Sequence, residues 1–195
     1  TGFNVGEYSV IADPETTELD QAYIQYKSDN FTARVGRQVI TLDDHRFVGH
    51  VAWRQDKQTF DAISAKYAVN SELELFYSYL YKRNRIFAEA ADLDSKDHIL
   101  HAAYQSKIGK FVAYAYLLEV DNDTNNALDT YGISYDGKTT TESVNWAYGA
   151  EFATQTSESG SGDAATSFDA SYFNAYLGAT FSGITAKVDY EVLGS

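Results

Sequence analysis

The chain has 195 residues, a formal net charge of −13 and no cysteine, so it has the length of one domain and cannot form disulfides or thiolate metal sites. The negative charge argues against nucleic acid as the principal partner, because a phosphate backbone favours clustered Lys and Arg. Mean hydropathy is −0.37, and no stretch approaches the roughly 18 consecutive apolar residues of a membrane-spanning helix. Sixteen tyrosines and a single proline favour extended structure.

The first predicted elements form a hairpin. Residues 19–28 alternate between apolar and polar side chains, and residues 31–40 do the same after a short turn at 29–30. A period of two places alternate side chains on opposite faces of a strand. Residues 41–57 break this alternation with charged, histidine and tryptophan side chains. We therefore expect a long loop there, of the class that often carries function.

The clearest alternation lies in the next pair of strands, predicted at residues 58–69 and 71–83. In the second of them one face holds two leucines and three tyrosines, while glutamate, serine and lysine occur on the other face. Such a strand suits lipid on one side and water on the other. A second long, charged loop is expected at residues 84–96.

The rest of the chain continues the same pattern. Strands are predicted at residues 98–108, 111–120, 131–135, 144–156, 168–181 and 184–193, with loops at 121–126, 137–143 and 156–167. About ten strands joined alternately by tight turns and long loops predict an all-β fold, an antiparallel up-and-down transmembrane β-barrel. The whole of residues 1–195 is expected to form one such domain.

A soluble antiparallel barrel or sandwich also alternates. Tyrosines near the strand ends favour the membrane barrel, because they resemble the aromatic girdle at a membrane interface. The alternative function is a soluble ligand-binding β-barrel with an aromatic-lined pocket.

Three stretches of the sequence resemble outer-membrane proteins of the alginate export family, a branch of bacterial porin-like barrels. They are residues 12–26, 34–62 and 190–195, and the middle one carries GRQ, RFVG, WRQ and TFDA in one order. The resemblance implies a monomeric channel in the bacterial outer membrane, surrounded by lipid and lipopolysaccharide. It also implies passive transport or export of small solutes or of an anionic polysaccharide such as alginate.

Both ends of the sequence differ from this family. Members are considerably longer, and such barrels finish on a terminal aromatic residue, whereas this sequence ends at Leu193-Gly194-Ser195. The sequence starts at Thr1 rather than at an initiator methionine, so we expect a processed product or an excised piece. A partial barrel has two unpaired edge strands, which lipid does not tolerate. We therefore expect an interior part, truncated at both ends, of a larger barrel.

Charged residues on the predicted strands are candidates for the solute path. Lys27, Arg34 and Lys66 share the polar parity of their strands. Glu74 and Lys82 lie among the polar positions of the strand at 71–83. Basic residues in a lumen lower the barrier for an anion, although pairing with lumenal acids would make them purely structural.

The predicted loop at 41–57 adds Arg46 and Arg54, which could fold inward, narrow the pore and contribute to anion preference. Arg37 is also a candidate for the pore lining. It has the parity of the lipid face, so it reaches the lumen only if Gly36 marks a bulge.

We expect no enzyme activity, catalytic residue, metal or cofactor. His45 and His50 lie near two aspartates, but no serine in a nucleophile-elbow context accompanies them. His98 and His101 are three positions apart, which sends them to opposite faces of a strand.

Overall fold

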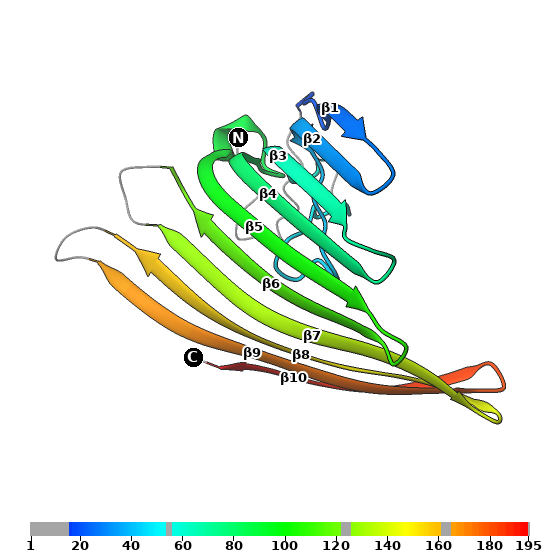
Figure 1. Ribbon diagram of the computed structural model, residues 1–195. Helices are drawn as coiled ribbons and strands as arrows, with labels where there is room; N and C mark the ends of the chain where they lie inside the picture. Colours follow the sequence, from blue (N-terminus) through cyan, green and yellow to red (C-terminus); the bar gives the residue numbers. More distant parts are fainter. Residues whose placement is uncertain (1–15, 54–55, 122–125, 161–164, 195) are drawn as a thin grey trace.

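The computed structural model describes residues 16–53, 56–121, 126–160 and 165–194, and it contains one antiparallel sheet of ten strands in chain order (Figure 1). The strands are β1 (Ala22–Lys27), β2 (Phe31–Gln38), β3 (Thr59–Ala68), β4 (Leu73–Asn84), β5 (Leu93–Gln105), β6 (Lys110–Glu119), β7 (Ala127–Thr141), β8 (Val144–Ser159), β9 (Thr166–Phe181) and β10 (Ile184–Gly194). A 3-10 turn, η1 (Glu89–Ala91), precedes β5. The predicted up-and-down antiparallel fold is confirmed.

The sheet is curved but open (Figure 1). Within the part of the chain that the structure describes, β1 pairs with β2 alone and β10 with β9 alone. Neighbouring hairpins are also staggered: Lys110 at the start of β6 pairs with Asp136, whereas β7 continues to Thr141. Such stagger accompanies the strand tilt of a barrel wall.

Several predicted strand boundaries are wrong, including the start of β7 at Ala127 and the end of β8 at Ser159. Strand β7 continues through the loop expected at 137–143, because residues 137–141 keep pairing with β8. Strand β5 starts at Leu93, inside the loop expected at 84–96. With β7 extended, only Glu142 and Ser143 separate it from β8. Short turns and long connections therefore alternate along the whole sheet, which is the asymmetry of a barrel with short turns on one side of a membrane.

The two faces of the sheet have opposite characters. Apolar residues on one face are highly exposed, for example Ile24 at 82% and Val188 at 73%. The hydrophobic core lies on the other face, between the sheet and the connection that follows β2. This connection contributes the buried Ile40 and Val48 to the core. Among the described residues no helix is long or apolar enough to cross a membrane. We call the core-bearing face the inner face and the opposite one the outward face.

One glycine on the inner face is required by close packing. Gly132 in β7 pairs with Tyr114 in β6, and a Cβ atom at position 132 would overlap the Tyr114 ring. Gly132→Ala is expected to lower the free energy of unfolding by about 1–3 kcal/mol, as overpacking does. Urea unfolding of the protein in detergent, followed by circular dichroism, measures this.

Gly178→Ala in β9 is the matched control, because a Cβ atom there meets its nearest neighbours at 3.7 Å, an ordinary contact. Equal unfolding midpoints for the two variants would contradict the packing argument.

Candidate functional site

The described part of the connection between β2 and β3, residues 39–53 and 56–58, folds onto the inner face of the sheet; we call it the inner loop. Its Arg46 donates from both Nη atoms to the carboxylate of Glu191 in β10, at 3.1 and 3.3 Å. The guanidinium of Arg46 also lies 4.4 Å from the ring centroid of Tyr172 in β9. The inner loop thus reaches from the β2 side of the sheet to its last strand.

Aromatic packing supplies a second anchor for the inner loop. The ring of Phe47 lies 5.7 Å from that of Tyr114, 6.3 Å from that of Tyr116 and 5.8 Å from that of Tyr172, measured between centroids. These three tyrosines are buried. Aromatic pairs at such separations contribute about 0.5–1.5 kcal/mol each beyond their buried area.

Asp43 supplies the third anchor. Its carboxylate lies 2.9 Å from Nε2 of His101 in β5 and 3.0 Å from Nζ of Lys110 in β6. Partial burial acts to raise the pKa of Asp43, but the hydrogen bonds and charges of His101 and Lys110 outweigh it and hold this pKa below its ordinary value. The carboxylate therefore stays ionised at neutral pH and keeps the inner loop attached.

Two polar grooves flank the inner loop. The first, of about 700 Å³, reaches the short turn between β1 and β2 and contains Lys27, Arg34 and Lys66. Its acids are Asp29 and Glu74. We call it the basic groove.

The second groove, of about 800 Å³, lies over β6 to β10. Its acids outnumber its Lys and Arg residues, so we call it the acidic groove. The charged residues that line it are Arg46, Lys110, Lys187, Asp43, Asp44, Asp136, Glu151, Asp189 and Glu191.

Four predicted residues, Lys27, Arg34, Lys66 and Glu74, come together in the basic groove. Lys66 forms an ion pair with Glu74 at 2.7 Å. Arg34 instead donates to the neutral amide oxygen of Gln25 at 2.7 Å. In the described part of the chain neither Arg34 nor Lys27 has an acidic partner. Lys27 and Arg34 are therefore the basic residues of the groove that form no ion pair, and together they exceed the charge of its unpaired acid, Asp29.

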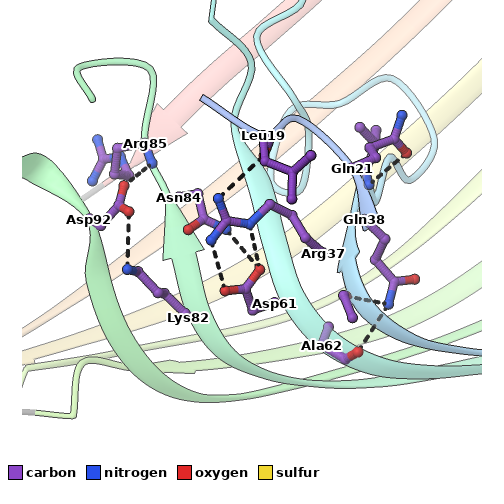
Figure 2. Close-up of polar contacts among 12 residues, drawn as sticks. Leu19, Gln21, Arg37, Gln38, Asp61, Ala62, Lys82, Asn84, Arg85 and Asp92 are labelled. Carbon is purple, nitrogen blue, oxygen red and sulfur yellow. Dashed lines mark hydrogen bonds and ion pairs between the residues drawn. The ribbon is translucent and has the colours of Figure 1, made fainter. Parts of the chain in front are cut away.

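The prediction that Arg37 lines the pore is wrong. The register of β2 with β1 and β3 continues without a shift at Gly36, so no bulge turns Arg37 inward. Figure 2 shows its guanidinium against the carboxylate of Asp61, at 2.8 and 3.1 Å. Asn84 donates to the same carboxylate at 3.2 Å. Arg37 thus belongs to a polar cluster on the outward face, near the long connections.

The prediction that Lys82 lines the pore is also wrong, for a different reason. The register of β4 shifts between Leu80 and Lys82, so Lys82 pairs with the outward-facing Asp61 rather than continuing the inward series. Its ammonium lies 3.2 Å from the carboxylate of Asp92 (Figure 2). Arg54, the remaining candidate, lies outside the described residues.

Several polar residues of the acidic groove were not singled out from the sequence. Tyr176 donates to Asp136 at 2.7 Å, and Asn174 donates to Asp189 at 2.6 Å. Lys187 pairs with Asp189 at 2.9 Å. Asp189 is expected among the lumenal acids from the sequence, and the alternation of the last strand is the signal that also places Lys187 on the polar face.

The comparisons with known proteins agree with this geometry. A family model described as "Alginate export" matches residues 9–190. No curated protein matches the chain.

Three solved structures are similar in fold. OccK8 (OprE) of Pseudomonas aeruginosa superposes with a TM-score of 0.71 at 16% identity, over 88% of this chain and 49% of that one. OccAB3 of Acinetobacter baumannii gives 0.66 at 17% identity, over 88% and 44%. The outer-membrane protein OpdK of Pseudomonas aeruginosa gives 0.64 at 13% identity, over 88% and 47%. The chain spans about half the length of each.

Proposed function

The chain belongs to the alginate export family, and from that premise we propose that it forms wall and constriction of a passive channel through the Gram-negative outer membrane. The observation that carries this proposal is the inner loop, held across a charged inner face while the outward face is apolar. Solute diffuses along the grooves that flank this loop, and no covalent chemistry is involved. An outer-membrane barrel also argues against a soluble ligand-binding barrel, because its exposed aromatic face contacts lipid rather than a ligand.

We propose an anionic solute for this channel, either a small acid or an acidic saccharide. The family description names alginate, a polysaccharide that bears carboxylates, and the basic groove supports the same class. Lys27 and Arg34 are its basic residues without an ion pair, and they attract a carboxylate. Arg46 contributes less to anion preference, because Glu191 and Asp44 offset its charge.

Replacing Lys27 and Arg34 together with glutamine is expected to reduce the anion-over-cation permeability ratio of the channel. A unit charge about 4 Å away contributes about 1 kcal/mol in water, so the ratio should fall roughly fivefold or more. The reversal potential across a salt gradient measures this ratio, with the natural full-length protein in a planar bilayer.

Lys107→Gln is the control for removing a basic residue elsewhere, because Lys107 is exposed in the short turn between β5 and β6 and lies outside both grooves. It should keep the reversal potential of the wild type. An unchanged potential in the double variant would remove the anion proposal. A measurement of conductance itself tests the channel separately.

A further inference from the structure

We propose that the outward face binds one phospholipid of the inner leaflet, in an apolar groove that crosses strands β4 to β9. The inference depends on the outer-membrane location and goes beyond the passage of solute. The groove has a volume of about 510 Å³. That is several times the roughly 150 Å³ of an apolar protein cavity that binds benzene.

Two neighbouring rows of side chains line this lipid groove. Each row runs directly across the strands through paired positions, and small residues form the floor while rings form the walls. The first row is Ala102, Ala113, Ile133, Phe152 and Phe173, and the second is Leu73, Tyr104, Phe111, Tyr135 and Ala150, so that each row crosses five strands. Alternation places both rows on the outward face, opposite the buried Val112 and Tyr114.

The direction and length of the lipid groove suit one acyl chain. Five strands spaced about 4.8 Å apart give a length of about 19 Å. Strands of a membrane barrel tilt about 45°, so a groove perpendicular to them covers about 13 Å of depth. Half of a hydrocarbon core that is about 30 Å thick is about 15 Å. The groove therefore matches the depth of a single leaflet.

A basic residue lies at the shallow end of the lipid groove. Tyr104 and Phe111 flank the short turn at 106–109, and the Tyr135 hydroxyl donates to the carbonyl oxygen of Ile108 in that turn at 2.7 Å. Lys107 is exposed on the same turn and has no ion-pair partner among the residues described. Short turns lie on the periplasmic side, where the leaflet consists of phospholipid. Lys107 is thus positioned for the phosphate of a lipid whose chain fills the groove.

Native mass spectrometry of the full-length protein in mild detergent tests this site, with phosphatidylglycerol, phosphatidylethanolamine and lipopolysaccharide offered at equal concentration. The wild type is expected to retain one phospholipid. Ala113→Leu with Ala150→Leu fills the groove floor at two exposed positions, and should lower phospholipid occupancy roughly tenfold. Lys107→Gln leaves the groove intact and should lower it roughly fivefold.

Ala186→Leu is the matched control, because Ala186 is an exposed outward-face alanine in β10 that does not line the groove. It should retain phospholipid like the wild type. Equal occupancy in the wild type and the double leucine variant would overturn the site. Retention of lipopolysaccharide in place of phospholipid would overturn the leaflet assignment, and a Lys107→Gln variant that binds like the wild type would overturn the phosphate contact.

Discussion

Asp97→Ala is expected to lower the free energy of unfolding by about 3–5 kcal/mol, the cost of leaving a buried charge without its partner. Asp97 is fully buried in β5, and its carboxylate accepts two hydrogen bonds from Arg83, both at 2.6 Å. It also accepts the backbone N–H of Glu119 at 2.9 Å. Removal of the carboxylate therefore leaves the Arg83 guanidinium and one backbone N–H without their hydrogen-bond acceptor. Urea unfolding in detergent, monitored by circular dichroism, gives the difference.

Glu74→Ala is the matched control for this prediction. Glu74 also forms a short ion pair, at 2.7 Å to Lys66, but both side chains are about half exposed. Such a pair contributes about 0–1 kcal/mol. A second variant, Asp97→Ala with Arg83→Leu, should recover part of the loss, because no buried charge remains unpaired. Equal destabilisation by Asp97→Ala and Glu74→Ala would contradict the argument from burial.

Phe47→Ala is expected to detach the inner loop and to raise the single-channel conductance of the full-length protein. Truncation of a packed phenylalanine costs about 3 kcal/mol, which lowers the ratio of docked to undocked loop roughly a hundredfold. The anchors that remain, the ion pairs of Arg46 and Asp43, are partly exposed and therefore hold the inner loop only weakly. Recordings in planar bilayers should therefore show a larger conductance and more open-channel noise than the wild type.

Phe87→Ala serves as its control. Phe87 lies in the connection between β4 and β5 and is exposed, so its truncation should leave both conductance and noise unchanged. A Phe47→Ala channel indistinguishable from the wild type would show that the inner loop does not constrict the pore.

The strands and their faces follow from alternation wherever one face is apolar. Leu75, Tyr77 and Tyr79 mark β4 clearly, and the structure exposes Leu75 and Tyr77 on the outward face. The last residues of β7 are Lys138 and three threonines, so nothing apolar marks them as a strand. Their conformation comes from pairing with β8, which a local pattern does not contain.

Local sequence patterns predict only part of the candidate site. Parity places Lys27, Arg34, Lys66 and Glu74 correctly, because their strands are regular up to those positions. Lys82 lies just beyond a register shift, which reverses the side to which it points. The anchors of the inner loop depend on tertiary contacts, and no periodicity within residues 41–57 indicates that Phe47 packs between three tyrosines.

The span of the Arg46–Glu191 pair has a consequence for the order of folding. These residues are 145 positions apart, whereas each hairpin of the sheet pairs with its immediate neighbours in the chain. Contacts of high sequence separation form late, because closing the chain between them costs entropy first. The Arg46 anchor has no partner until β10 has joined the sheet. We therefore expect the inner loop to be fully anchored across the inner face only after β10 has paired with β9.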